Sequence, residues 1–435
     1  MITFDNIEKF SKRYHCYNYF LRFFHDHLYY RKYYVINKEN VPPKGLMDAL
    51  AILYLFEDDR QPVFIARGDI FKKDWIAKIL RFLKILPTFR NRDGGVGDIK
   101  RNNITFEHAA RILRKGGTLV MFPEAGHQAG HFMSTFKKGF PRIAFAAEEE
   151  NDFKLGLKIL PLNIHYSDYF NCRSKLMVTV GKPFTFQEFF EQYTTDPNLA
   201  YLALNEKARA AVKALTPDIE FPEYYPEMEL LRQMLCKPRL KAKGIDPDYF
   251  PNQKPEEVIL IQELTEMKEN DSENFLRLMN ITKEYRQGLE QYNLRDWLIN
   301  KKITFWKLLL ATVGFVIAFP LFLFGWIHNI LPFEFSAIFR KKIKDRMLHS
   351  SVNFVGGFVA FTLVYILIFT IAWWLSKSVL FALAYLVAVF ISFYIFYQYK
   401  RGFIKLKAAW RYYNLKRKGI LHRIGELKQE IMKGW

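Results

Sequence analysis

Residues 118–126, Thr-Leu-Val-Met-Phe-Pro-Glu-Ala-Gly, constrain the fold of this chain more than any other stretch. An apolar run ends there abruptly in a proline, an acid and a glycine. That pattern predicts a buried strand followed by a tight turn. In α/β sheets, ligands collect at the carboxyl ends of the strands. Glu124 is therefore expected at a sheet edge where a ligand can bind, although an ordinary strand-to-helix turn is the alternative.

Basic residues follow this turn. Lys137 and Lys138 come just before Gly139 and a helical pattern over residues 140–150. The amino end of a helix favours anions, because its backbone N–H groups are unpaired. A strand, an acid-bearing turn and a basic helix start therefore predict a pocket for an anionic substrate.

Strand and helix patterns alternate over the first part of the chain. Strand patterns cover residues 33–37, 62–67, 87–89, 118–122, 159–164 and 175–180, and helix patterns cover residues 75–86, 104–115 and 140–150. Such alternation predicts an α/β fold with a mostly parallel sheet flanked by helices.

The chain is strongly basic, with a formal net charge of +20, and 17% of its residues are aromatic. Such a charge favours nucleic acid, an anionic membrane or an anionic substrate as a partner. Nucleic acid is disfavoured, because apolar runs at residues 308–331, 354–375 and 379–397 approach the length that crosses a bilayer. Aromatic and basic residues together suit a membrane interface with anionic lipids.

These patterns divide the chain into five segments. The pattern of residues 1–32 predicts an amphipathic helix, which either lies at the membrane interface or packs on the next domain. Residues 33–190 form the α/β domain, residues 191–302 a helical arm, residues 303–400 a membrane region and residues 401–435 a basic amphipathic tail.

The topology of the membrane region follows from its charges. The last two apolar runs are separated by only three residues, so they predict a tight hairpin. Basic clusters begin at Lys301, Arg340 and Lys400. Three plain crossings would place the middle cluster on the far side, against the positive-inside rule. We therefore expect residues 308–331 to bend at Pro320 and re-enter, with a full crossing as the alternative.

Cysteine usage favours a reducing compartment. Cys16, Cys172 and Cys236 are widely spaced and predict neither a disulfide frame nor a metal site. No pair of His or acidic residues has the spacing of metal ligands beside a partner cluster, so no metal is expected.

Three blocks of residues resemble motifs of the glycerolphosphate and lysophosphatidate acyltransferases. They are Phe-Pro-Glu-Ala-Gly at 122–126, Phe-Arg-Asn-Arg-Asp-Gly at 89–94 and Leu-Pro-Leu at 160–162. Lys-Lys-Gly at 137–139 strengthens the likeness, which spans residues 33–184. Membrane-anchored bacterial members with a helical C-terminal extension look most similar.

The resemblance implies transfer of an acyl group from a thioester, on coenzyme A or acyl carrier protein, to a hydroxyl of glycerol 3-phosphate or its 1-acyl derivative. No cofactor is implied, because the thioester is a substrate. In this family a His in a His-x-x-x-x-Asp block is the base, and basic residues hold the phosphate. The resemblance implies that Asp48 and Glu124 are catalytic. It implies substrate binding by Arg90, Arg92, Phe122, Pro123, Gly126, Lys137 and Arg67.

The block that should carry the base departs from the family pattern. Asp48 occupies the place of the motif Asp, yet the residue five positions earlier is Pro43, and no His lies between Asn37 and Asp48. The strand before the block is missing as well. We infer that about 10 residues, a strand and a turn, are absent between Gly45 and Leu46.

The sequence therefore leaves two main hypotheses. One is a phospholipid-synthesising O-acyltransferase of the inner membrane, whose active domain and basic flanks face the cytoplasm. The other is a catalytically inert lipid-binding or scaffold protein that keeps the pocket without the base. His127 or His131 could replace the missing base, whereas His165 is expected to be structural. A transport role is disfavoured, because the apolar runs contain no acids.

Overall fold

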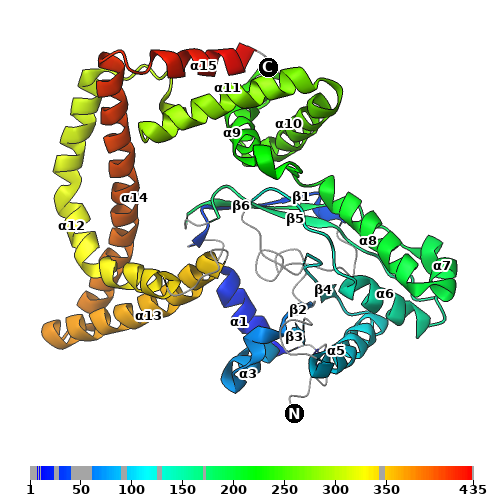
Figure 1. Cartoon of the computed structure of the whole chain (residues 1–435). Coiled ribbons are helices and arrows are strands. Elements are labelled where there is room, and N and C mark those ends of the chain that lie inside the picture. Colours follow the sequence, from blue (N-terminus) through cyan, green and yellow to red (C-terminus); the bar gives the residue numbers. More distant parts are fainter. Residues whose placement is uncertain are drawn as a thin grey trace. The chain divides into compact units, whose positions relative to one another are not determined.

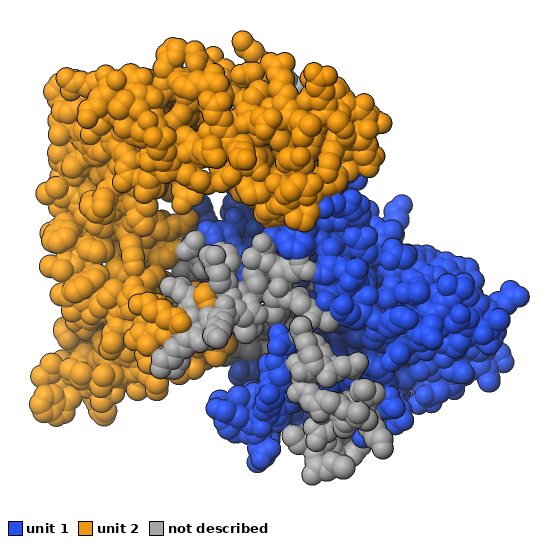
Figure 2. Space-filling model, in the orientation of Figure 1, with its two compact units in different colours: residues 1–220, 245–262 blue, residues 221–244, 263–435 orange. Residues whose placement is uncertain are grey.

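The structure is a computed structural model, and the chain in it forms two compact units (Figure 2). Unit 1 comprises residues 1–220 and 245–262, and unit 2 comprises residues 221–244 and 263–435. The structure describes residues 7, 9, 11–23, 29–40, 61–89, 96–124, 130–169, 173–341 and 348–433. The predicted site residues Asp48, Arg90, Arg92 and Gly126 lie outside the described residues.

The motif strand belongs to a parallel three-stranded sheet of unit 1 (Figure 1). In this sheet β2 (Val63–Arg67) lies between β3 (Ile85–Thr88) and β4 (Leu119–Val120), and both pairings are parallel. Val63 packs with apolar residues of the flanking helices, whereas Phe64 packs with residues of the second sheet. Burial on both faces explains why these strands are continuous apolar runs in the sequence.

The second sheet of unit 1 is mixed. Its central strand β6 (Lys175–Val180) pairs in parallel with β1 (Lys32–Ile36) and antiparallel with β5 (Leu162–Tyr166). The predicted α/β class with mostly parallel strands and flanking helices is confirmed. The strands form two sheets whose apolar faces share one hydrophobic cluster.

Helices cover these sheets within unit 1. They are α1 (Lys12–Phe23), α3 (Asp74–Phe82), α5 (Val96–Arg114), α6 (Gly139–Glu149), α7 (Phe190–Thr195), α8 (Pro197–Lys213) and the first part of α10 (Phe250–Asn270). Helix α3 is shorter than the sequence predicts. Lys84 adopts a left-handed conformation with φ of 60°, and β3 begins at the next residue. The apolar residues 85 and 86 therefore belong to a strand.

Helix α1 packs on unit 1, which is one of the two arrangements that the sequence allowed. Tyr14 is buried, and its ring meets the ring of Phe82 edge-on at 6.1 Å between centroids. Lys84 Nζ donates a hydrogen bond of 2.6 Å to the carbonyl of Lys9, just before the helix. Tyr19 on the same helix is 64% exposed. One side of α1 therefore covers α3, and another side is open to solvent or lipid.

Unit 2 is entirely helical over its described residues. It contains η6 (Pro222–Tyr224), α9 (Tyr225–Ala242), the last part of α10, α11 (Ser272–Gln291), η7 (Asp296–Leu298), α12 (Phe305–Lys341), α13 (Leu348–Ser376), α14 (Val379–Arg417) and α15 (His422–Lys433). In α15, Ile424, Leu427 and Ile431 are buried, and Arg423 Nε donates to Glu284 Oε1 of α11 at 2.8 Å. The apolar face of the predicted membrane-surface tail is therefore used for packing inside unit 2.

Within the described part of unit 2, three helices are long and apolar enough to cross a membrane. Their candidate spans are Phe305–Phe335, Asn353–Ser376 and Val379–Arg417. Polar side chains connect all three within these spans. Asn329 Nδ2 of α12 donates to Ser392 Oγ of α14 at 3.1 Å, and Tyr365 OH of α13 donates to Asn329 Oδ1 at 2.8 Å. Such interhelical hydrogen bonds stabilise helix packing where no water is available.

Helix α12 continues through Pro320 without interruption, and the re-entrant topology expected for residues 308–331 stays a prediction. Beyond Pro320, Phe322 and Phe333 both contact Phe396 of α14, with ring centroids at 5.9 Å and 5.4 Å. Pro332 lies in this stretch, and a proline inside a helix removes a backbone hydrogen bond and promotes a bend.

Candidate active site

The carboxyl ends of β2, β3 and β4 meet at one edge of the parallel sheet. The register pairs Phe64 with Val120 and Arg67 with Thr88, so the residues that follow each strand reach the same edge. Arg67 is the last residue of β2, and Glu124 follows shortly after β4. The predicted motif therefore lies where α/β folds bind their ligands.

The start of the arginine block is held firmly at this edge. Asn102 of α5 makes two hydrogen bonds with Phe89: its Nδ2 donates to the carbonyl at 2.6 Å, and its Oδ1 accepts from the amide at 2.7 Å. Gly68 lies against the same ring, since a Cβ there would be 2.3 Å from Phe89 Cδ1. Arg90 and Arg92 follow Phe89 directly in the sequence.

Glu124 is half-buried and is held by the loop that follows it. The Ser134 amide donates to Glu124 Oε2 at 3.3 Å, and the Lys137 amide donates to the carbonyl of Pro123 at 2.8 Å. Burial raises the pKa of Glu124 above the usual carboxyl range, and the negative charge of Asp218 adds to this effect. The hydrogen bond from Ser134 opposes it. The carboxyl group is therefore positioned but incompletely solvated.

A second acid and an arginine join Glu124 from a distant part of the sequence. Asp218 is buried, and its Oδ1 accepts a hydrogen bond of 2.8 Å from the Met133 amide. Arg209 of α8 brings its Nη2 to 3.9 Å from Asp218 Oδ2. The positive charge of Arg209 lowers the pKa of both Glu124 and Asp218, but burial dominates and both pKa values are raised.

The sequence analysis did not identify Arg209 or Asp218. Neither residue belongs to a recognised motif, and each is one of many charged residues in a helical, charged stretch. The only local signal is the Thr-Pro-Asp turn at residues 216–218, which marks the end of a helix rather than a site.

The remaining predicted binding residues differ in their availability. Phe122 is 50% exposed beside Glu124, and Lys137 is also exposed. Arg67 shares the sheet edge, but its Nε and Nη2 donate to the two carboxylate oxygens of Asp69. The forked face of its guanidinium is therefore already occupied, and Arg67 is poorly placed to bind a phosphate.

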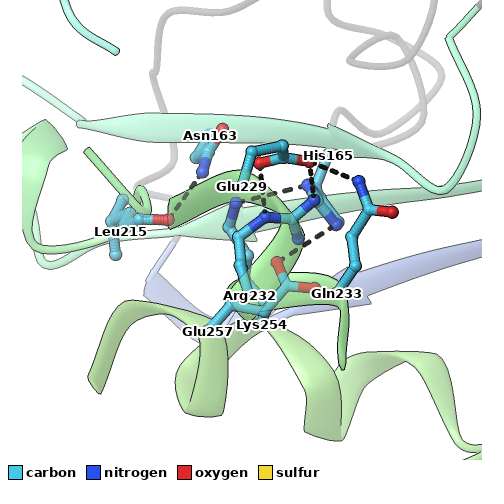
Figure 3. A network of polar contacts seen from close by, with 8 residues as sticks. All are labelled: Asn163, His165, Leu215, Glu229, Arg232, Gln233, Lys254 and Glu257. Carbon is cyan, nitrogen blue, oxygen red and sulfur yellow. Dashed lines mark hydrogen bonds and ion pairs between the residues drawn. The ribbon is translucent and has the colours of Figure 1, made fainter. Parts of the chain in front are cut away.

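His165 is buried within unit 1, as a structural residue should be. Its Nδ1 lies 3.2 Å from Lys254 Nζ, and its Nε2 lies 3.7 Å from Glu257 Oε2 (Figure 3). Its ring stacks on Phe250 at 5.3 Å between centroids, and the ring of His131 lies 5.9 Å away. These contacts attach the start of α10 to β5, so His165 has a packing role.

The other histidines near the motif have different surroundings. His131 lies in the loop whose Met133 and Ser134 amides bind Asp218 and Glu124. His108 on α5 contacts Arg111 Nη2 through its Nδ1 at 2.7 Å, and His127 lies outside the described residues. Among the described residues, no group of three or more His, Cys, Asp or Glu side chains is arranged to hold a metal ion.

The match to a family model agrees with the motif blocks. Residues 43–165 match the family model described as Acyltransferase, so this segment, which includes Asp48 and Glu124, carries the sequence pattern of that family. A solved structure, the 1-acyl-sn-glycerophosphate (LPA) acyltransferase PlsC from Thermotoga maritima, is 18% identical, and the match covers 48% of this chain and 78% of that chain with a TM-score of 0.28. No curated protein matched the chain.

Proposed function

We propose that this protein is a membrane-bound O-acyltransferase of phospholipid synthesis. It moves a fatty acyl group from acyl-CoA or acyl carrier protein to a hydroxyl of glycerol 3-phosphate or 1-acylglycerol 3-phosphate. The thioester C–S bond breaks, an ester C–O bond forms, and the hydroxyl proton passes to a base. The observation that carries this proposal is the acyltransferase pattern over residues 43–165, whose Glu124 lies at the carboxyl edge of a parallel sheet.

Within this proposal, the site residues act mainly by binding and orienting the acceptor. Glu124 accepts hydrogen bonds from the glycerol hydroxyls, and the Ser134 amide holds its carboxylate in place. Arg90 and Arg92 follow the fixed residue Phe89 and bind the phosphate, because a forked guanidinium matches phosphate oxygens. Orienting a hydroxyl towards a thioester lowers the entropic part of the barrier.

We further propose that the apolar helices hold the enzyme at the inner membrane, with the α/β domain and the basic flanks on the cytoplasmic side among anionic lipids. The support is the apolar length of three helices and the basic clusters that begin at Lys301, Arg340 and Lys400. Cysteine labelling of residues 340–346 in intact cells tests this topology. Labelling by an impermeant reagent from outside would exclude it.

The central test is acyl transfer by membranes that contain the protein. Membranes are incubated with a labelled acyl thioester and with each acceptor in turn, and the labelled product is separated and counted. Glu124→Ala and Arg90→Ala should each lower transfer at least tenfold, while expression remains normal. Glu206→Ala is the matched control, because Glu206 is exposed on α8. Equal transfer by the Glu124→Ala variant and the control would refute the assigned role.

A catalytically inert lipid-binding protein is the second candidate. Its support is the missing motif His, since Pro43 stands five positions before Asp48. The intact mass of the purified protein separates the two cases. A mass of 51.7 kDa means that the segment is truly deleted, and such a protein should bind lysophosphatidate without transferring an acyl group. A mass about 1 kDa higher means that the strand and turn are present.

A further inference from the structure

We propose that Arg209 and Asp218 complete the acceptor site around Glu124. Arg209 binds the phosphate of the acceptor, and Asp218 accepts a hydrogen bond from its glycerol part. Both residues lie beyond residues 43–165, the segment that matches the acyltransferase family model. The inference rests on the proposed function, because it names further groups that hold the same class of substrate.

One loop fixes both carboxylates. Consecutive amides of this loop make the two hydrogen bonds, from Met133 to Asp218 at 2.8 Å and from Ser134 to Glu124 at 3.3 Å. The Ile219 amide also donates to the carbonyl of His131 at 2.7 Å, so the chain around Asp218 lies along this loop. Asp218 is therefore attached to the same structural element that positions the motif acid.

The buried polar atoms of Asp218 and Arg209 are incompletely satisfied. Asp218 Oδ2 and Arg209 Nε are buried and have no hydrogen-bond partner among the residues that the structure describes. The Asp218 side chain is only 3% exposed. Buried polar groups are nearly always paired in folded proteins. An acceptor that offers hydroxyl groups to Asp218 and phosphate oxygens to Arg209 would satisfy both.

Arg209 is not engaged in an ordinary structural ion pair. Its Nη2 lies 3.9 Å from Asp218 Oδ2, beyond hydrogen-bond distance. In the same chain, Arg239 binds Glu263 through two hydrogen bonds of 2.6 Å and 2.7 Å. The Arg209 side chain is 28% exposed, although its Nε is buried, so the residue lies at the border of the core. This arginine acts on the charge of Glu124 and has no bidentate carboxylate partner among the described residues, as a phosphate-binding arginine requires.

The electrostatics of the site fit an anionic ligand despite its two acids. Burial raises the pKa of Glu124 and of Asp218, which makes a proton on either group less costly. A protonated carboxyl group repels a phosphate less and can donate a hydrogen bond to it. The predicted alternative Arg67 is paired with Asp69, which leaves Arg209 as the available arginine among the described residues at Glu124.

Ligand binding by the full-length protein in detergent micelles tests this inference. The probes are 1-acylglycerol 3-phosphate, glycerol 3-phosphate, inorganic phosphate and 1-acylglycerol, which lacks phosphate. Arg209→Gln should weaken binding of the two phosphorylated acceptors about tenfold or more, and should leave binding of 1-acylglycerol nearly unchanged. Arg142→Gln is the matched control, because Arg142 is an exposed arginine of α6 whose guanidinium lies over Tyr201.

A second variant distinguishes a loss of ligand binding from misfolding. Asp218→Asn keeps an oxygen that can accept from the Met133 amide, and it should weaken binding of all glycerol-containing probes while the melting temperature without ligand is kept. Unchanged binding of 1-acylglycerol 3-phosphate by Arg209→Gln would overturn the proposal. An equal loss in the Arg142→Gln control, or no binding of phosphorylated acceptors by the wild type, would also overturn it.

Kinetics separate this inference from the proposed function. If the protein transfers acyl groups, Arg209→Gln should raise the KM for the phosphorylated acceptor about tenfold, with a smaller change in kcat. An unchanged KM refutes the role of Arg209 and leaves the acyltransferase function standing. If the protein binds phosphorylated acceptors through Arg209 but transfers no acyl group, the inference stands and the enzymatic function fails.

Discussion

The substitution Gly325→Ala tests how closely α12 and α14 pack. A Cβ at Gly325 would lie 2.5 Å from the carbonyl oxygen of Ser392 and 3.1 Å from Phe396 Cβ. A backbone oxygen cannot rotate away as a flexible side chain can, so the two helices must separate. One turn further along α12, Asn329 makes its hydrogen bonds to Ser392 and Tyr365, and this separation would lengthen the first of them.

The expected loss of stability follows from three contributions. Overpacking a close contact costs about 1–3 kcal/mol. A weakened interhelical hydrogen bond in a membrane adds about 0.6 kcal/mol. The better helix propensity of Ala returns at most about 1 kcal/mol. We therefore expect Gly325→Ala to reduce the free energy of unfolding by about 1–3 kcal/mol.

Gly314 provides a control on the same helix. A Cβ at Gly314 would meet nothing within 4 Å, so Gly314→Ala should be neutral or stabilising by up to about 1 kcal/mol. Both variants are purified in mixed micelles and unfolded with increasing sodium dodecyl sulfate, and circular dichroism follows the loss of helix. Free energies that agree within about 0.5 kcal/mol would refute the close approach of the two helices.

Three further variants test the site and the arm. Burial raises the pKa of Glu124, so the folded protein loses stability as pH rises from the ordinary carboxyl pKa through the raised value. Glu124→Gln carries no charge and should therefore raise the melting temperature at pH values above this range. Below the ordinary carboxyl pKa, where Glu124 is protonated, the gain should vanish. Tyr285→Phe removes the hydrogen bond of 2.7 Å from the buried Tyr285 to Asp296 and should cost about 1–2 kcal/mol, measured by thermal unfolding. Gly68→Ala drives a Cβ into the Phe89 ring and should both lower the melting temperature and raise the KM for the acceptor, whereas unchanged values would contradict the close contact.

Much of the α/β domain could be predicted because its signals are local. An apolar run closed by a proline and an acid identified β4 and the turn that carries Glu124, and similar patterns located β2 and β6. The predicted end of α3, at residue 86, was wrong, because the hydrophobic pattern does not show the backbone conformation of Lys84. Lys84 adopts a positive φ, which a lysine seldom does, and the following apolar residues pair with β2 instead of continuing the helix.

The candidate site was only partly predictable, because some of its residues meet through long-range contacts that local sequence patterns do not show. Glu124 stands in a motif of consecutive residues, so its chemistry is visible in the sequence. Asp218 reaches the site only because the chain folds back over 85 residues to the Met133 amide. Arg67 illustrates the opposite case, since its sheet-edge position was predictable but its pairing with Asp69 was not.

The membrane region shows how far prediction from the sequence alone extends. The number of its apolar helices follows from the sequence, because a bilayer requires about 20 apolar residues whose backbone hydrogen bonds are internal. Their lengths do not, since α14 continues to Arg417, well past the apolar run that ends at residue 397. The contacts between these helices do not follow, because the sequence does not show which side chains of α12 meet α14. Only the folded structure shows that Phe322 and Phe333 of α12 both pack against Phe396 of α14. Local patterns thus determined the elements of this protein, and long-range contacts decided which polar groups meet, because such contacts depend on the whole folded chain.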